Sequence, residues 1–572
     1  MKSTIRLIGL LAILLGANGC DTDDFLEQIP QDAYTTGSVY QTEADMILAV
    51  NGLYTFLPFL EADASDQKMW FWTDDGWRRR GRFGTLLDWT MDDSNDLLNY
   101  YRYDGIRQCN EVLSRLPDAD FDSGDVRQRL EAEARFIRAM LYERMVFLYG
   151  DVPMVTEPQG EDFDPSRDSR LEVFNFVVSE LEEASQRLPD SYEVSEAGRI
   201  TRWAALAVLS RAYLDALGWH PDPDSMYDNA EVALGRIIGE GGFALDEGVE
   251  GFSLLFSPES DFDGPEPSTA VLLSRAYIEG ELFYEEMANK CLPRGSFQGT
   301  GDGSGNNQAQ YGATWNLISS FQTNDGLAPV DGLGTTYSEE MPYENRDPRL
   351  RASFILPGDA LQSIDGGGIG YYNFQPHPDL TDFRDDGIGR RTAIETGYLI
   401  RKYSGLGIEN DSTLVYENPS RAHADYKIIR YAEVLLMMAE CRAADNSAEA
   451  LDYINQVRNR VGMPGYNGIA DVPTSVMSGT TGNALIDAVL LERRYEFAGE
   501  GFQRMSDIWR YRLGDQVFGR VEGIPMDPEN PGDLTGERFE AGEKEWDERN
   551  YLFPLPLSAL DLNPNLENNP NW

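Results

Sequence analysis

Apolar residues recur at helical spacing in two long blocks of the chain, and this pattern limits the fold more than any other feature. In the first block it predicts six helices: residues 41–56, 99–116, 126–149, 169–188, 198–217 and 226–239. In the second block, the i, i+3, i+4, i+7 spacing of one buried helix face is followed by Tyr431, Val434, Leu435 and Met438. A similar stripe contains Leu451, Ile454, Val457 and Val461, and a third helix is predicted over residues 483–500. The sequence therefore predicts a mainly α-helical protein.

The helices of each block are expected to pack in pairs. A short turn of sequence AADNSAE joins the first two helices of the second block, which predicts antiparallel packing. The alanine-rich stretch RWAALAVLSRAYLDALG in the first block favours close approach between helices. Successive pairs of this size are similar to degenerate tetratricopeptide repeats, although the strict period of about 34 residues is missing. We expect a curved scaffold of tetratricopeptide-like helix pairs.

Between the two blocks the chain changes to Gly, Pro, Asp, Asn and aromatic residues, with stretches such as GSFQGTGDGSGNNQAQYG. Loops of this length in a compact protein are usually functional, so we expect this irregular section to carry the binding face. Residues 61–98 have the same character on a smaller scale. We predict one domain over residues 41–572, with these parts: a helical scaffold at 41–242 and 427–515, a loop-rich binding section at 243–426, and a C-terminal extended segment at 516–572.

The N-terminus has the pattern of a lipoprotein export signal. Lys2 and Arg6 precede an apolar run, residues 7–15, and the small residues Ala17, Asn18 and Gly19 lead to Cys20. The run is too short to span a bilayer, so residues 1–19 are interpreted as a cleaved signal peptide. Cys20 is predicted to be the lipid anchor, and residues 20–40 an extended acidic tether. The alternative is an ordinary secretory signal followed by an unrelated cysteine.

Composition excludes several classes of function. The chain has 97 acidic and 48 basic residues and a formal net charge of −49, which disfavours binding to nucleic acid. With a mean hydropathy of −0.42, it is expected to contact the membrane only through its N-terminal lipid. Beyond Cys20, the odd number of widely spaced cysteines implies no disulfide framework: Cys109, Cys291 and Cys441. We expect these three side chains to be buried.

No pattern for catalysis or for a cofactor is present. Glycoside hydrolysis needs two placed carboxylates, but among so many acidic residues any chosen pair carries no weight. The run DGGGIGYY lacks the flanking strand and helix of a nucleotide loop and is interpreted as a turn. Asp302, Ser304 and Asn306 match three positions of a calcium loop, but Asn307 and Ala313 break its pattern. We therefore predict a protein that is not an enzyme and has no cofactor, although its acidity permits an adventitious calcium ion.

Seven segments together give the chain a resemblance to a known family. They are DDFLEQIPQDAY after Cys20, AEARFIRAMLYERMVFLYGDVPMV (132–155), NRDPRL (345–350), RYAEVLLMMAECRA (430–443), INQVRNRVG (454–462), ERRYEFAGEGFQRMSDIWRYR (492–512) and the C-terminal YLFPLPLSALDLNPNLENNPNW. In order and spacing these resemble the SusD/RagB family of nutrient-binding outer-membrane lipoproteins of the Bacteroidetes.

The resemblance implies a mainly helical, single-domain protein on the cell surface. It would act as a lid over a SusC-like TonB-dependent transporter that imports glycans or peptides. In the organisms of this family, an acidic patch after the anchor cysteine marks lipoproteins for the outer face, and Asp21, Asp23 and Asp24 match it. Most motif residues are expected to be structural: Arg493, Glu496 and Glu500 as ion pairs between helices, and Arg346 and Arg349 as forks onto carboxylates.

Sugar binding requires aromatic rings beside planar polar groups, and two places in the chain offer this combination. The richest is MWFWTDDGWRRRGRFG, residues 69–84, from which we select Trp70, Trp72, Asp74, Asp75, Trp77 and Arg78. At least one of the three tryptophans is expected in the core, and Trp72 and Trp77 are favoured over Trp70 to face a ligand. The second place supplies Tyr284, Phe297, Tyr311 and Trp315, the last of which is equally well explained as a core anchor. A weaker third set is Tyr371, Tyr372 and Phe374.

We hypothesise that the protein captures oligosaccharides and delivers them to a SusC-like transporter without chemical change. Three alternatives remain. The first is capture of peptides, as in the RagB branch of the resembled family; the second is a surface glycoside hydrolase; the third is a structural lid with no ligand of its own.

Overall fold

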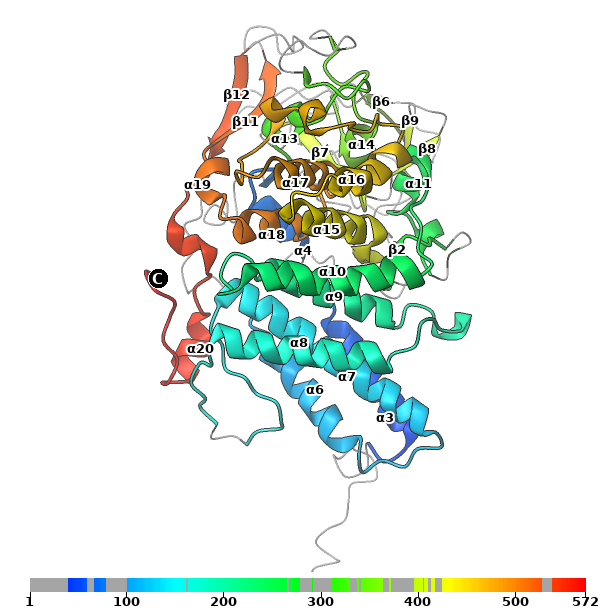
Figure 1. The fold of residues 1–572 in the computed structure, drawn as a ribbon, viewed down its shortest axis with the longest axis vertical. Coiled ribbons are helices and arrows are strands. Elements are labelled where there is room, and N and C mark those ends of the chain that lie inside the picture. The colour runs from blue at the N-terminus through cyan, green and yellow to red at the C-terminus, as the bar shows by residue number, and fades with distance from the viewer. Residues whose placement is uncertain are drawn as a thin grey trace, which may run out of the picture.

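Helices follow one another along the chain and stack side by side, as Figure 1 shows. The computed structural model describes residues 40–58, 66–78, 100–160, 163–262, 264, 267–277, 291, 311–329, 337–338, 341–357, 359–363, 370–371, 394, 396–404, 406–409, 413–416, 424–526 and 537–572. The helices of the first block are α3 (Glu43–Leu53), α6 (Tyr103–Arg115), α7 (Gly124–Tyr149), α8 (Arg170–Arg187), α9 (Arg202–Asp215) and α10 (Pro223–Glu240). From α6 to α10 each helix packs against the next. The predicted mainly helical fold with paired helices is confirmed.

Local capping explains why these helices begin and end where they do. The Thr42 hydroxyl accepts a hydrogen bond from the Asp45 amide at 3.2 Å, and the Asp45 carboxylate accepts one from the Thr42 amide at 3.0 Å. Ser169 and Glu172 form the same reciprocal capping box at the start of α8. Helix α7 stops at Gly150, whose φ of 72° lies in the left-handed region that favours glycine. The predicted helix boundaries agree with the structure within a few residues.

The second block contains α15 (Tyr431–Ala444), α16 (Glu449–Arg460), α17 (Ala484–Glu496) and α18 (Gln503–Arg510). Helix α15 packs against α9, α10, α16 and α17. It is therefore buried on all sides, with every residue from Tyr431 to Cys441 in the interior, whereas the sequence predicted a single buried face. The contact between α10 and α15 joins the two blocks into one stack (Figure 1).

Within the described ranges, four small sheets accompany the helices. The first has the antiparallel order β1 (Gly76–Arg78), β3 (Tyr311–Ala313), β7 (Tyr398–Ile400) and β4 (Phe354–Ile355). The second pairs β2 (Val271–Arg275) with β10 (Tyr426–Arg430). The third has the order β6 (Gly370–Tyr371), β5 (Ala360–Ser363), β9 (Thr413–Tyr416) and β8 (Leu406–Glu409), in which β5 and β9 are parallel. The fourth is the pair β11 (Arg520–Met526) and β12 (Glu537–Glu543).

Short helices connect these parts: α4 (Asp66–Phe71), α11 (Gly248–Leu254), α13 (Trp315–Ser320), α14 (Arg349–Ser353), α19 (Gly514–Val517) and α20 (Leu557–Leu562). Single 3₁₀ turns lie at η1 (Tyr54–Phe56), η3 (Val194–Glu196), η4 (Pro258–Ser260), η7 (Ile469–Asp471), η8 (Thr474–Val476) and η9 (Glu548–Tyr551). The C-terminal segment is thus not simply extended, because it contains the β11–β12 pair and two short helical elements. The chain ends at one side of the stack, about level with α10, and α20 lies below this end (Figure 1).

The strands β2 and β10 form a ribbon at the root of the loop-rich section. Their register pairs Tyr426 with Arg275 and Arg430 with Val271, so the chain enters and leaves the section through neighbouring strands. The carboxylate of Asp425 closes the ribbon, because it accepts hydrogen bonds from the Tyr277 amide at 3.1 Å and from the Ser274 hydroxyl at 3.0 Å.

One contiguous hydrophobic core extends along the chain from Met46 to Phe553. Cys109, Cys291 and Cys441 are buried, as predicted. None of the described helices is both long and apolar enough to cross a membrane. The predicted signal peptide and the anchor Cys20 lie outside the described residues.

A buried ion network joins α17 to the rest of the core. Glu496 accepts hydrogen bonds from Arg349, Arg430 and Arg460 at 3.2, 2.9 and 2.5 Å. Glu500 pairs with Arg430 and with Lys402. The predicted ion pairs between helices are confirmed for Glu496 and for Arg493, which pairs with Asp507 on α18. Glu500 also forms ion pairs, but it lies beyond the end of α17 and its partners are not in helices, so the prediction is wrong for this residue.

The two arginines of the NRDPRL motif differ in their partners. Arg349 forks onto Asp347, at 3.1 and 2.7 Å, as predicted. Arg346 instead donates to backbone carbonyl groups, among them those of Ile318 and Phe321 at 3.0 Å. The prediction of a carboxylate fork is therefore wrong for Arg346, which holds the end of α13 in place.

Gly235 offers a test of the helical scaffold. It lies inside α10, and a Cβ atom added there would meet nothing within 4 Å. We expect Gly235→Ala to raise the free energy of unfolding by about 0.5–1 kcal/mol, because alanine loses less backbone entropy on folding than glycine. Urea denaturation measures the change. Gly312→Ala is the contrasting variant, since its Cβ would collide with the Tyr398 carbonyl in the neighbouring strand, and it should destabilise. Destabilisation by both substitutions would contradict the described packing of α10.

Candidate functional site

The first part of the aromatic segment predicted to bind glycans forms α4 and β1, and its three tryptophans are buried. Trp70 and Trp77 have no exposed surface, and Trp72 is 2% exposed. Trp70 stacks on Phe354 with 6.3 Å between ring centroids, and Trp72 meets Phe553 edge-on at 5.3 Å. A ring that binds a sugar must offer one face to solvent. The structure therefore corrects the expectation that Trp72 and Trp77 face a ligand, because both lie in the core.

Asp74 and Asp75 are also buried, and each is held by an arginine from the second helical block. Arg504 forks onto Asp74 at 2.9 and 2.8 Å. Arg494 donates to Asp75 at 2.8 Å. Burial alone would raise the pKa of Asp74, but the guanidinium groups of Arg504 and Arg494 lower it to about 2. Burial raises the pKa of Asp75, although Arg494 opposes this effect. These carboxylates anchor the segment and are not placed to bind a ligand.

Lys544, which directly follows β12, also holds the segment that contains Asp74 and Asp75. Its ammonium group donates to the backbone carbonyl groups of Phe71 and Gly76 at 2.8 and 2.7 Å, and also to that of Thr73. It lies 5.9 Å from the centre of the Trp77 ring. Burial lowers the pKa of Lys544 to about 7, while the charges of Asp74 and Asp75 oppose this effect. The turn between α4 and β1 is thus fixed by charges from three distant parts of the chain.

Two of the predicted site residues, Arg78 and Tyr311, meet at one corner of the first sheet. They are paired in the β1–β3 register, and the Arg78 guanidinium lies 5.4 Å from the centre of the Tyr311 ring. Phe71 stacks on Tyr311 at 4.4 Å. Arg78 is 4% and Tyr311 1% exposed, so neither offers a free face.

The antiparallel register of β1 and β3 determines where the chain leaves the first sheet and where it re-enters it. Arg78 is the last residue of β1 and Tyr311 the first of β3. The chain therefore leaves the sheet just before residues 79–99 and re-enters it just after residues 278–310, at the same corner. Tyr284 and Phe297, the remaining predicted aromatics, belong to the second of these segments and lie outside the described residues.

Trp315 begins α13 and is a core anchor rather than a platform. Thr314 caps the helix, Trp315 is 5% exposed, and its ring stacks on Tyr398 at 6.2 Å. Of the weaker third set, Tyr371 lies in β6, while Tyr372 and Phe374 fall outside the described residues.

The predicted absence of a metal site is tested only in part. Within the ranges that the structure describes, no three His, Cys, Asp or Glu side chains form a group that could hold a metal ion. The calcium-like residues Asp302, Ser304 and Asn306 lie outside these ranges.

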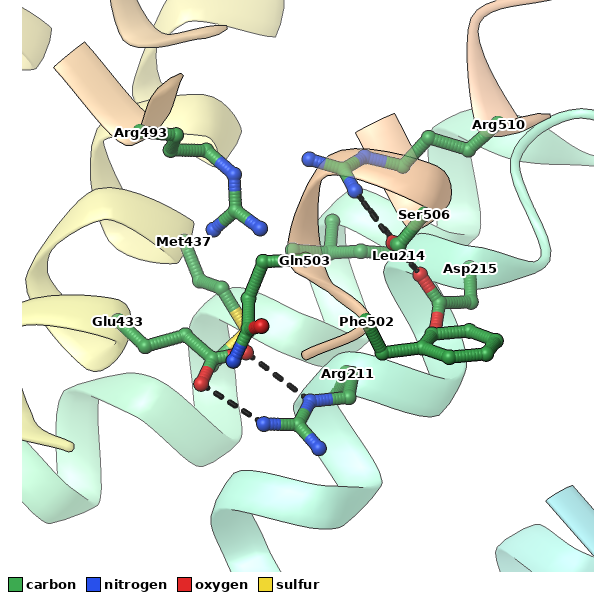
Figure 2. A pocket seen from close by; sticks show the side chains of 10 residues that line it. All are labelled: Arg211, Leu214, Asp215, Glu433, Met437, Arg493, Phe502, Gln503, Ser506 and Arg510. Carbon is green, nitrogen blue, oxygen red and sulfur yellow. Dashed lines mark hydrogen bonds and ion pairs between the residues drawn. The ribbon is translucent and has the colours of Figure 1, made fainter. Parts of the chain in front are cut away.

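A small cavity of about 10 Å³ lies among α9, α15 and α18. Figure 2 shows the side chains that line it. Arg211 forks onto Glu433 at 2.9 and 2.7 Å on one side of it. On the other side the Ser506 hydroxyl donates to Asp215 and accepts from Arg510 at 2.6 Å. A cavity of this size holds about one water molecule. It serves the packing of charged groups between helices and is too small for a sugar.

Comparison with known proteins identifies the fold as a whole. A family model described as the SusD family matches residues 278–572, more than half of the chain. The chain belongs to the SusD family. A second model, described as "Starch-binding associating with outer membrane", matches residues 62–214, which include the buried aromatic segment. The predicted membership is confirmed, and neither description names a catalysed reaction.

Full-length relatives support the assignment to the SusD family. SusD-like protein P2 of Formosa agariphila is 25% identical over 587 residues, which cover 99% of each chain. A SusD-like protein of Bacteroides ovatus is 26% identical over 524 residues, covering 87% of this chain and 81% of the relative.

Solved SusD-like structures share the fold. A SusD-like protein of Bacteroides fragilis has a TM-score of 0.74 at 22% identity, with 95% of this chain and all of that chain covered. A structure described as a laminarin binding SusD-like protein has a TM-score of 0.63 at 19% identity, covering 93% of this chain and all of that chain. At these identities the likeness concerns the fold alone.

Three residues that anchor the turn between α4 and β1 were not predicted: Arg494, Arg504 and Lys544. The first two lie in the segment ERRYEFAGEGFQRM, whose charged residues were expected to be structural. A signal was present in the adjacent acids Asp74 and Asp75, because two carboxylates among tryptophans need cationic partners once they are buried. The sequence did not indicate which of the 48 basic residues would supply them.

Proposed function

We propose that this SusD-family protein is a cell-surface lipoprotein, anchored through Cys20, that binds oligosaccharides and passes them to a SusC-like TonB-dependent transporter. The observation that carries the proposal is the pairing of Arg78 with Tyr311, because the chain leaves the first sheet after Arg78 and re-enters it at Tyr311, at the same corner. Glycan binding is further supported by a matching family description that mentions starch binding and the outer membrane, and by a structural neighbour described as laminarin binding. No step of the proposal makes or breaks a bond.

The buried layer below this corner gives the binding segments a rigid base. The three tryptophans and the Asp–Arg pairs fix the turn that leads into residues 79–99. Residues 278–310, with Tyr284 and Phe297, reach the same corner at Tyr311. We therefore assign sugar stacking to Tyr284 and Phe297, and support of the site to the buried residues.

Isothermal titration against laminarin and starch oligosaccharides tests this assignment. We expect Tyr284→Ala and Phe297→Ala each to weaken glycan binding about tenfold or more, as the loss of a central aromatic contact commonly does. Phe163→Ala is the matched control, because it removes an aromatic ring that is 42% exposed on the helical scaffold. Unchanged affinity in both loop variants, with the fold intact, would refute the assignment.

Three further measurements separate the alternatives. Binding of peptides, with no heat from any glycan, would favour a RagB-like role. Release of new reducing ends from a bound glycan would identify a hydrolase. Transport that persists in cells after removal of the loop aromatics would indicate a structural lid.

A further inference from the structure

A second cavity lies where the C-terminal residues pack against the helical stack. Its volume is about 240 Å³, and it is lined by residues from the first turn of α8, the end of α9, the end of α18, η9 and residues 569–571. It shares no lining residue with the Arg78–Tyr311 corner. Drug-sized ligands usually occupy about 300–1,000 Å³. This cleft therefore suits a smaller ligand, such as a single sugar ring.

Three arginines line the cleft, and each lies over an aromatic ring. The Arg170 guanidinium is 4.2 Å from the ring centre of Trp219. Arg512 lies 4.0 Å from Tyr551, and Arg549 lies 4.4 Å from Trp572. Stacking fixes the plane of a guanidinium without using its in-plane N–H donors. One donor of each guanidinium is already used: Arg170 donates to the Phe147 carbonyl at 3.2 Å, Arg549 donates to the Asn571 carbonyl at 3.1 Å, and Arg512 pairs with Glu548. The other in-plane donors are suited to binding an oxyanion.

Several polar atoms of the cleft residues have no hydrogen-bond partner among the described protein atoms. They are Nε of Arg170, Nε of Arg549 and Oδ2 of Asp215. Asp215 is 5% exposed, and its other oxygen accepts from Ser506, as Figure 2 shows. Buried polar groups in native proteins are nearly always hydrogen-bonded, to protein or to ordered water, so a bound molecule or a water is expected to complete these three atoms.

The charge of the cleft contrasts with that of the protein. Its three guanidinium groups face two carboxylates, Asp215 and Glu548, in a chain with a net charge of −49. Glu548 pairs with Arg512 at the surface. Among the described residues, Arg170 forms no ion pair. Burial lowers the pKa of Arg170 to about 9; the charge of Asp151 opposes this effect and the charge of Arg512 adds to it. An anionic ligand would compensate this group.

We propose that the cleft is a second binding site, which takes one pyranose ring bearing a carboxylate or a sulfate group. The sugar class rests on the proposed function, whereas recognition of the oxyanion rests on the three arginines alone. Arg170 and Arg512 bind the oxyanion, as guanidinium groups do in paired hydrogen bonds. Asp215 Oδ2 accepts a hydrogen bond from a ring hydroxyl.

Titration of the full-length mature protein with glucuronate, glucose 6-sulfate and glucose tests the proposal. We expect at least one of the charged sugars to bind about tenfold or more tightly than glucose, as hydrogen bonds to charged groups imply. Arg170→Gln should remove this preference, and Arg170→Lys should keep only part of it. Glu548→Gln should strengthen binding several-fold, because it frees Arg512, and the exposed position of Glu548 protects the fold.

Equal affinity for glucose and for both charged sugars would overturn the proposal. So would unchanged affinity in folded Arg170→Gln, or weaker binding in Glu548→Gln. Tyr284→Ala separates this site from the first one, because it should leave binding of the charged sugar unchanged. If the neutral oligosaccharides fail to bind while glucuronate or glucose 6-sulfate binds with the stated dependence on Arg170, the second site stands and the proposed function falls.

Discussion

Glu496→Gln is expected to lower the free energy of unfolding by about 3–5 kcal/mol, the usual cost of breaking a buried ion pair. The carboxylate is fully buried and contacts Arg349, Arg430 and Arg460. Its loss leaves these guanidinium groups with less negative charge in a medium that solvates them poorly. Guanidinium chloride unfolding of both proteins at pH 7 measures the difference.

The effect should depend on pH with a definite sign. Burial alone would raise the pKa of Glu496, but the surrounding arginines, Arg460 first, lower it well below its ordinary value of 4.5. A carboxyl group with a lowered pKa in the folded state stabilises the protein above the unfolded pKa and loses that contribution as the pH falls. The gap between wild type and variant should therefore be constant from pH 6 to 8 and shrink below about pH 4.5.

Glu111→Gln is the matched control for this experiment. Glu111 forms an i,i+4 pair with Arg115 at 2.8 Å on the surface of α6. Exposed pairs of this kind contribute about 0–1 kcal/mol. A loss for Glu496→Gln as small as that for Glu111→Gln would show that the network does not stabilise the fold.

Trp77→Ala is expected to destabilise the protein by about 3–5 kcal/mol, because it removes a fully buried ring and leaves a cavity. Lys544 lies beside the ring and the chain at Gly76 approaches Trp70 closely, so the surroundings have little freedom to collapse. Trp77→Phe should cost less, since an aromatic ring still fills most of the space. Thermal unfolding of both variants, together with glycan titration of the folded Trp77→Phe protein, checks this.

The two roles for Trp77 predict opposite results. If the ring supports the core, stability falls while the folded Trp77→Phe protein keeps its glycan affinity. If the ring stacked on sugar, Trp77→Ala would keep its melting temperature and lose affinity. The second pattern would restore the interpretation that the structure has corrected.

Helical periodicity was sufficient to predict the scaffold, because the pattern is local. The end of α8 and the turn between α15 and α16 follow from a few adjacent residues each. The complete burial of α15 was not predicted, since its second buried face depends on α9 and α10, which are distant in sequence. For the same reason, the sequence did not decide whether the aromatic residues beside Asp74 and Asp75 lie in the core or face a ligand. The partners that bury Asp74 and Asp75 lie 430 and 419 residues away, and a local pattern cannot reveal them.

The ribbon of β2 and β10 joins the helical scaffold to residues 276–425, and selection can act differently on these two parts of the chain. Because residues 276–425 start and end on the paired strands β2 and β10, their length and composition can change without moving α10 away from α15. Selection for a new ligand can therefore act on the parts of residues 276–425 outside the core. Selection for stability acts on the helices and on the residues of this section that reach the core, such as Arg349 and Lys402. A section from a relative, exchanged at these two strands, should fold on this scaffold and bring its own specificity with it.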